Sequence, residues 1–211
     1  MAGRDFDYWW NVAGEWVEEP NRRRKGWSGM MRVLSEGRVH YVKRQLNHLC
    51  RTWRHPFGWP TTSREWHYLK RMRELGIGAP SPVFHGVRRT PQGVEAVLVT
   101  EDLTGYADLT GWRDLPADER GRMATVIGEV LGRLHGARLQ HSCLYDKHVM
   151  VRRHGDSFEA ALIDLEKMRP RLTTGLAAGR DLEQFRRRQG LFGDAEWGAL
   201  LAAHARTLSV A

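Results

Sequence analysis

The feature that most constrains this chain is a polar loop between two short apolar stretches, followed by one carboxylate at the end of a third. The loop opens on His141 within residues 139–151 and leads into a short β-branched run. A further apolar run, residues 161–163, ends on Asp164. Leaving a carboxylate without a partner at the end of a buried strand costs free energy. We therefore expect Asp164 to face a metal ion or another cation.

The composition allows one domain, or two small lobes that share a cleft. The chain has 211 residues, and 41% of them are hydrophobic, which is enough for a core. Basic residues outnumber acidic residues by 33 to 25, so the net charge is +8. This charge favours a polyanionic partner: nucleic acid, an anionic membrane or a phosphorylated substrate. Arginine used freely on solvated faces would give the same balance, and charge alone does not separate these readings.

Membrane and cysteine signals point to an intracellular protein. The sequence has no run of about 18 apolar residues and no apolar core of a signal peptide near its start. We therefore expect a cytoplasmic location. Cys50 and Cys143 are the only cysteines, and neither belongs to a C-x-x-C pair. From this we expect neither a disulfide framework nor a structural zinc site.

Strand signals dominate the first half of the chain. A Ser-Glu-Gly turn and a Thr-Pro-Gln-Gly turn each separate two runs of strand-forming residues, which predicts two hairpins. The alternation along the second run places Lys43 on the same face as Val39 and Tyr41. The predicted strands cover residues 29–34, 38–43, 83–87 and 94–100.

Helical signals dominate the second half, after one helix that opens at residues 60–65. Thr62 and Glu65 have the spacing of a capping box at that opening. A strand-rich part followed by a helix-rich part predicts an α+β plan. The expected apolar stripe of the first helix is Trp66, Leu69, Met72 and Leu75. The later helices are expected over residues 116–135 with Gly136 as the stop, and from about Arg180 and Ala195.

Several segments, taken together and in order, resemble the lipopolysaccharide kinase (WaaP/InaA) family, a compact bacterial branch of the protein-kinase-like fold. The resemblance implies a two-lobe fold, compact, with a small β-rich N-lobe (residues 1–101) that binds nucleotide and a shortened helical C-lobe (residues 102–211). It also implies transfer of phosphate from ATP, with Mg²⁺, to a sugar of the lipopolysaccharide inner core, heptose in particular. The matching segments are Arg24–Gly29, Tyr41–Gln45, Asn47-His48, Arg64-Glu65, Leu98–Leu103, His141–His148, Ile163–Glu166 and Arg180–Leu182.

Phosphoryl transfer depends on positioning and on charge neutralisation around a loose transition state, which gives the N-lobe residues their expected roles. Lys43 would bind the triphosphate, and Glu65 would hold that lysine in place. The alternatives are an exposed edge-strand lysine and a carboxylate that only caps the helix. Gly26 and Gly29, which follow a basic run, would cradle phosphates, unless the intervening tryptophan simply packs on the sheet. The resemblance places Glu101 beside the nucleotide as well.

The loop that opens on His141 departs from the wider kinase pattern. Cys143 stands where protein kinases have the Asp that accepts the proton of the substrate hydroxyl, and a thiol with an ordinary pKa of about 8.5 is a poor replacement. Asp146 is the alternative base, from a shifted position. His148 stands in place of the second Mg²⁺ ligand, but imidazole suits Mg²⁺ badly, so we expect it to bond phosphate or to pack structurally. His141 would tie the loop to the lobe, and a Cys143–His141 hydrolase dyad is disfavoured.

Asp164 is the expected metal ligand, because Mg²⁺ prefers oxygen donors and would bridge phosphate oxygens at this carboxylate. The alternative is a buried ion pair with a nearby Arg or Lys. Glu166 would face the same side if the strand continued, either as a further ligand or as a surface charge.

Two other functions stay open at this point. The Cys143 and His148 departures favour a pseudokinase that binds nucleotide or glycolipid and regulates without turnover. A nucleic-acid binder fits the charge, but the Arg and Trp residues are spread over many elements and form no single basic stripe. The resemblance implies the lipopolysaccharide core glycolipid as the partner; we also expect a peripheral contact with the anionic inner membrane and no specific nucleic acid.

Overall fold

The computed structural model describes residues 4–23 and 26–208, which form two units. The first unit comprises residues 1–70 and 80–102, and the second comprises residues 71–79 and 103–211. The sequence-based division placed residues 71–79 in the first domain, and the structure differs here. Gly78 forms a parallel bridge with Ala161, and the Leu162 N–H donates to the Gly78 carbonyl at 2.9 Å, so this segment belongs with the second unit.

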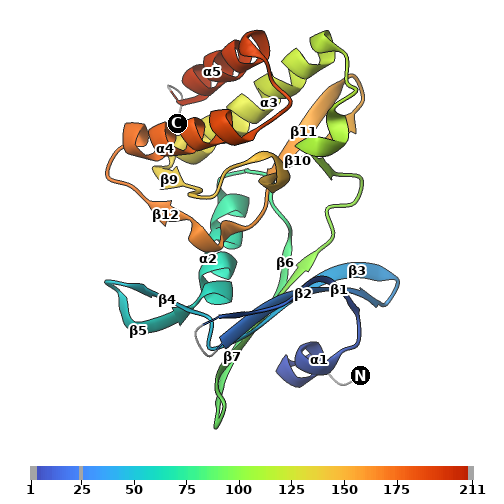
Figure 1. Ribbon diagram of the computed structural model, residues 1–211, viewed down its shortest axis with the longest axis vertical. Coiled ribbons are helices and arrows are strands. Elements are labelled where there is room, and N and C mark those ends of the chain that lie inside the picture. Colours follow the sequence, from blue (N-terminus) through green and yellow to red (C-terminus); the bar gives the residue numbers. More distant parts are fainter. Residues whose placement is uncertain (1–3, 24–25, 209–211) are drawn as a thin grey trace. The chain divides into compact units, whose positions relative to one another are not determined.

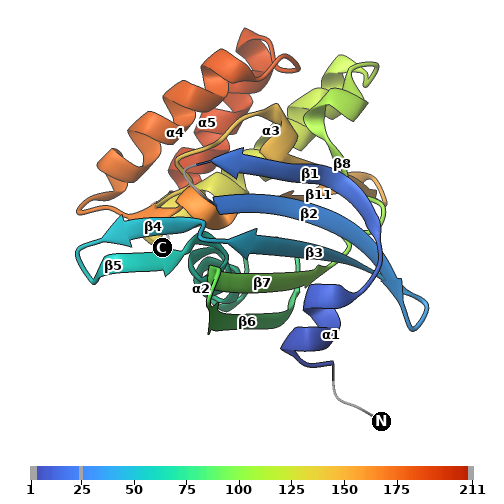
Figure 2. The same ribbon diagram turned by 60° about the horizontal axis from the view of Figure 1, so that its bottom comes forward.

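The first unit is built on a five-stranded antiparallel sheet with the order β1-β2-β3-β7-β6, whose strands lie side by side in Figure 2. Both predicted hairpins are confirmed, and their strands extend beyond the predicted ends. Glu36 and Gly37 have φ of 51° and 73°, as a two-residue hairpin turn requires. The strands are β1 Glu15–Arg23, β2 Gly26–Ser35, β3 Arg38–Leu46, β6 Pro82–Thr90 and β7 Gly93–Glu101.

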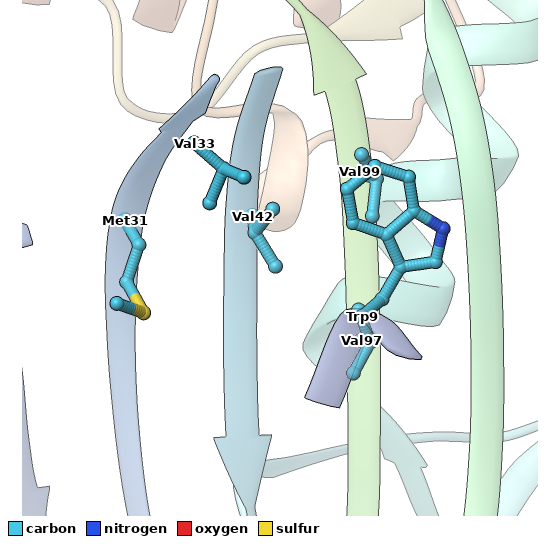
Figure 3. Close-up of a cluster of buried hydrophobic side chains, with 6 residues drawn as sticks. All are labelled: Trp9, Met31, Val33, Val42, Val97 and Val99. Carbon is cyan, nitrogen blue, oxygen red and sulfur yellow. The ribbon is translucent and has the colours of Figure 1, made fainter. Parts of the chain in front are cut away.

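One face of this sheet is covered by α1 (Phe6–Asn11), a short helix that the sequence analysis did not predict. Asp5 caps it, since the Asp5 carboxylate accepts from the Tyr8 N–H at 3.0 Å. The helix presents Trp9, 1% exposed, to the sheet. Figure 3 shows this indole over valines of the central strands, and the cluster stabilises the unit by apolar burial. Its buried members are Trp9, Met31, Val33, Val42, Val97 and Val99.

The other side chains of β3 reach α2 (Thr61–Glu74). The Gln45 amide oxygen accepts from the Thr62 N–H at 3.2 Å and from the Thr61 hydroxyl at 3.1 Å, so a strand residue caps this helix. The predicted capping box is wrong: within the described residues the buried Thr62 hydroxyl has no hydrogen-bond partner. Local spacing predicted the cap, but a side chain from another element satisfies the helix end.

The second unit contains three long helices, labelled in Figure 1, of which α3 packs closely against α5. A Cβ atom on Gly128 would lie 2.3 Å from the Leu200 carbonyl oxygen, so this contact requires glycine. The helix predicted over residues 116–135 is confirmed, but α4 begins six residues before Arg180, because the Thr173 side chain caps it by accepting from the Leu176 N–H. The helices are α3 Ala117–Gly136, α4 Thr174–Arg188 and α5 Asp194–Leu208.

Short strands and 3-10 turns complete the second unit. A three-stranded sheet has the order β11-β10-β8, and β9 pairs with β12. Within the described residues no helix is both long enough and apolar enough to cross a membrane. The strands are β8 Ala107–Asp108, β9 Leu139–Gln140, β10 Val149–His154, β11 Ser157–Leu162 and β12 Arg169–Pro170. The 3-10 turns are η1 Leu109–Trp112, η2 Asp146–His148 and η3 Leu165–Lys167.

Candidate functional site

A buried ion pair joins β3 to α2 in the first unit. Lys43 Nζ donates to Glu65 Oε2 at 2.9 Å, and the two side chains are only 10% and 9% exposed. The expected contact between these residues is therefore present. The edge-strand alternative for Lys43 is wrong, because β3 lies between β2 and β7. The Glu65 carboxylate bonds the lysine, while the Gln45 side chain accepts from the first N–H groups of α2.

Gly26 and Gly29 are strand residues of β2, and close packing explains both glycines. A Cβ atom on Gly26 would lie 2.4 Å from the Leu46 carbonyl oxygen, and one on Gly29 would lie 2.7 Å from the Trp16 ring. Residues 24–25 of the expected basic loop lie outside the described residues. The role of these glycines in phosphate binding stays a prediction.

Glu101 ends β7, and its carboxylate lies 3.5 Å from the Arg38 guanidinium. Its backbone N–H donates to the Ser81 carbonyl at 2.9 Å, which fixes this strand end. Both side chains of the ion pair are exposed, so the pair contributes little to stability. A role for Glu101 beside a nucleotide stays a prediction.

In the second unit, His141 joins the polar loop to the strand end that leads to Asp164. His141 Nε2 donates to the Ile163 carbonyl at 2.9 Å, and Nδ1 accepts from the Cys143 N–H at 3.3 Å. The ring is fully buried, and this burial lowers the pKa of His141, so the imidazole is neutral. Both ring nitrogens therefore bond backbone groups, which matches the expected structural role and leaves no nitrogen to activate a Cys143 nucleophile.

Asp181 of α4 anchors the loop by hydrogen bonds to its backbone. The sequence analysis gave this residue no role. Its carboxylate accepts from the His141 N–H at 2.6 Å and from the Ser142 N–H at 2.9 Å, and the residue is fully buried. A signal existed: Asp181 stands between Ala177 and Phe185 at four-residue spacing, on the buried stripe of an otherwise arginine-rich helix. A carboxylate on such a stripe requires donors, and two backbone amides of the loop supply them.

A histidine pair extends this network into the helices. His135 of α3 approaches the Asp181 carboxylate through Nε2 at 3.3 Å and bonds His204 Nε2 of α5 through Nδ1 at 2.9 Å. Burial, together with the neighbouring His135, lowers the pKa of His204 to about 4. The loop is thus connected to all three long helices of the unit by buried polar contacts.

The side chains of Cys143, His148 and Asp164 lie close together at this loop. Their sulfur, ring-nitrogen and carboxylate atoms all lie within 4.8 Å of one another. His148 Nδ1 donates to the Cys143 carbonyl at 2.7 Å, while His148 Nε2 lies 3.6 Å from Asp164 Oδ2. Lys167 Nζ donates to the Cys143 sulfur at 3.7 Å. Burial raises the pKa of the Cys143 thiol, and the Lys167 charge only partly opposes this, so the thiol is a poor proton acceptor.

The remaining predicted residues lie beside this cluster. Asp146 opens η2, and its carboxylate accepts from the Lys147 N–H at 2.9 Å; within the described residues it does not join the cluster of three. Asp164 has φ of 58°, in the left-handed region that Asp tolerates better than most residues. The chain then turns into η3, so the strand does not continue and the condition for Glu166 to share the Asp164 face is not met.

A family model described as the lipopolysaccharide kinase (Kdo/WaaP) family matches residues 7–204. The chain is 36% identical over 199 residues to Protein InaA of Escherichia coli (strain K12), covering 92% of each chain. Among solved structures it is similar to one described as WaaP in complex with acyl carrier protein, with a TM-score of 0.73 and 23% identity, over 97% of this chain and 84% of that one.

The structural likeness confirms the predicted fold class, a mixed fold of the kinase-like kind with a sheet-rich part and a helical part. At this identity it shows the fold alone. The family model covers most of the sequence, and the InaA likeness extends over nearly the whole of both chains. The chain therefore belongs to the lipopolysaccharide kinase (Kdo/WaaP) family.

Proposed function

We propose that this chain is an ATP-dependent kinase that phosphorylates a sugar of the lipopolysaccharide inner core, with heptose as the first acceptor to test. Membership of a kinase family implies ATP and a divalent metal. The observation that carries the proposal is the buried Lys43–Glu65 ion pair on the central strand of the first unit. A lysine held in this way is a fixed cation suited to the oxygens of a triphosphate.

The pair also explains how this cation is kept in one position. An ammonium and a carboxylate removed from water are stable only together, since breaking such a buried pair costs about 3–5 kcal/mol. Gln45 fixes the start of α2, and α2 in turn fixes Glu65, so the amine is held by strand and helix together. Such preorganised charge needs no rearrangement when negative charge develops on a transferring phosphoryl group.

The residues of the second unit fit Mg²⁺ poorly. Asp164 offers a carboxylate oxygen, which Mg²⁺ prefers, but the Cys143 sulfur and the His148 nitrogen beside it are softer donors. As a set, the three side chains do not match an oxygen-seeking ion. When bound, a divalent metal would neutralise phosphate charge; what the chain itself provides is the loop held by Asp181 and the carboxylate of Asp164.

One observation favours a second function, that of a nucleotide- or glycolipid-binding module without turnover. Protein kinases have at this position an Asp that acts as the catalytic base, whereas this loop has Cys143. Burial raises the pKa of the Cys143 thiol. Asp146, the alternative base, bonds the backbone of its own turn. A loose transition state needs little help from a base, so the kinase proposal predicts slow transfer and the second function predicts none.

The hairpin of β4 (Leu49–Thr52) and β5 (His55–Pro60) supports a peripheral contact with an anionic membrane. Trp53 is 85% exposed and Phe57 is 95% exposed, and Arg51 and Arg54 are exposed beside them. Aromatic rings favour the headgroup region of a bilayer, and each nearby basic residue contributes about 1 kcal/mol on an anionic surface. Flotation with phosphatidylglycerol vesicles tests this, and Trp53→Ser with Phe57→Ser should abolish co-flotation.

The main experiment combines nucleotide binding with phosphate transfer. The purified chain is incubated with radiolabelled ATP and dephosphorylated core oligosaccharide, with Mg²⁺, Mn²⁺ and Zn²⁺ in turn. Lys43→Met should reduce transfer at least about 100-fold, since it removes an electrostatic contact to the reacting phosphates. Lys70→Met, an exposed lysine of α2, is the matched control and should keep full activity. ATP binding without phosphate transfer in the wild type would favour the binding module. If Lys43→Met kept both ATP binding and phosphate transfer, both functions would be contradicted.

A further inference from the structure

The cluster of Cys143, His148 and Asp164 has the composition and the spacing of a metal site of a different kind from the one expected by resemblance. All three side chains belong to the second unit: Cys143 lies in the loop, His148 in η2, and Asp164 between β11 and η3. Sulfur, nitrogen and oxygen atoms face one another within 4.8 Å. Thiolate with imidazole is a donor pair that zinc and cobalt accept readily and that magnesium does not.

The orientation of His148 supports this reading. Because a carbonyl oxygen only accepts, the bond to the Cys143 carbonyl places the proton on His148 Nδ1. The other nitrogen, Nε2, then presents its lone pair on the side where Asp164 lies. Metal-ligating histidines are usually fixed in this way, with one nitrogen donating to a carbonyl or carboxylate and the other on the metal.

The distance between the nitrogen and oxygen atoms of the cluster is close to that between two ligands of a tetrahedral metal ion. With zinc bond lengths, nitrogen and oxygen ligands lie about 3.4 Å apart, and sulfur lies about 3.6 Å from either. His148 Nε2 and Asp164 Oδ2 are 3.6 Å apart, so they need almost no movement. The Cys143 sulfur lies within 4.8 Å of both, so the sulfur must move closer to them when an ion binds.

We propose that Cys143, His148 and Asp164 form a three-ligand site for a thiophilic divalent ion, with Zn²⁺ as the expected ion and a fourth position open to an oxygen ligand. Lys167, which is exposed, donates to the sulfur and can withdraw into solvent when the sulfur binds an ion. The sequence analysis identified Asp164 as a metal ligand but not Cys143 or His148, because these residues have no C-x-x-C spacing. The inference goes beyond phosphoryl transfer and depends only on these three side chains.

The test is a titration of the whole chain with Co²⁺ alone, followed by optical spectroscopy. Cobalt bound to a thiolate in a tetrahedral site gives a near-ultraviolet sulfur-to-metal band and intense visible bands, and added Zn²⁺ should bleach both. Cys143→Ser should lose the sulfur band, while Cys50→Ser, which changes the only other cysteine, should keep it. His148→Gln should weaken Co²⁺ binding by more than the roughly 10–100-fold typical of outer-shell losses. Circular dichroism verifies that each variant is folded.

A second variant keeps the proposal falsifiable if Cys143→Ser binds through its hydroxyl. Cys143→Asp converts the donors to two carboxylates and one imidazole, so its preference should shift from Zn²⁺ towards Mn²⁺, measured by electron paramagnetic resonance. A folded wild-type chain without the sulfur band, or a band that survives Cys143→Ser and disappears in Cys50→Ser, would overturn the proposal. Since no ATP or acceptor is present, a failure here is distinct from a failure of phosphate transfer.

Discussion

Replacing Asp181 with Asn should loosen the loop that carries His141 and Cys143. The carboxylate accepts from two backbone amides, the His141 N–H at 2.6 Å and the Ser142 N–H at 2.9 Å, through its two different oxygens. An Asn side chain has one oxygen and one NH₂ group. One of the two amides would therefore face a donor and remain buried without an acceptor.

The magnitude follows from these two bonds. A hydrogen bond to a charged group contributes about 1.5–3 kcal/mol, and an unsatisfied buried donor costs about 1–3 kcal/mol, so we expect about 2–4 kcal/mol in total for the loop. Because the chain has two units, a single unfolding midpoint is a poor measure. Hydrogen exchange followed by mass spectrometry resolves the loop peptides, whose protection should fall roughly 30- to 1,000-fold.

The matched control is Glu183→Gln, a carboxyl-to-amide change at an exposed position of the same helix. Its loop protection should stay within about threefold of the wild type, since exposed substitutions change stability by about 0.5 kcal/mol or less. Equal loop protection in Asp181→Asn and the wild type would refute the assigned role. So would an equal loss in the Glu183→Gln control.

Three other perturbations have expected outcomes. Lys43→Met should lower the free energy of unfolding in urea by about 3–5 kcal/mol, because it leaves the buried Glu65 carboxylate without its lysine. Adding Glu65→Leu should restore most of this stability. If the effects of the two substitutions were simply additive, the two residues would not be a coupled pair. Gly128→Val should lower the thermal midpoint sharply, since its Cβ would meet the Leu200 carbonyl at 2.3 Å, and an unchanged midpoint would contradict this packing. The pKa of His204 is lowered to about 4, so the unfolded chain takes up the proton first as pH falls. Stability should therefore drop by up to about 2 kcal/mol between pH 6.5 and 4, and His204→Gln should flatten this part of the profile.

Local patterns were sufficient to predict the hairpins and the longest helix. The β2–β3 and β6–β7 pairs need only an alternating run on each side of a short turn. The short helix α1 was not predicted, because six residues give little periodicity and its stability comes from Trp9 packing on Val97 and Val99, far along the chain.

Contacts between distant elements explain the wrong predictions. The Thr62–Glu65 spacing has the form of a capping box. In the structure, however, Gln45 of β3 accepts from the first turn of the helix, and Lys43 of β3 bonds the Glu65 carboxylate. The sequence cannot show this competition without the register of the sheet. Residues 71–79, which the sequence analysis placed in the first domain, include the end of α2, and the Gly78 backbone pairs with β11.

At the candidate site, residue identity was easier to predict than residue partnership. His141, Cys143, His148 and Asp164 were all identified from sequence, and the structure brings them together around one loop. Asp181 lies in the Arg180–Leu182 segment that contributes to the resemblance, but the sequence analysis gave this carboxylate no role. Only the structure, in which α4 packs against the loop, shows that this carboxylate accepts from two backbone amides.

Direct detection of phosphate on the acceptor tests the central claim. After incubation with ATP and a divalent metal, dephosphorylated core oligosaccharide is analysed by mass spectrometry and by ³¹P nuclear magnetic resonance. The account predicts one added phosphate on a core sugar with the wild-type chain and almost none with Lys43→Met. A folded wild-type chain that leaves the oligosaccharide unmodified with every metal tested would contradict the proposed kinase function.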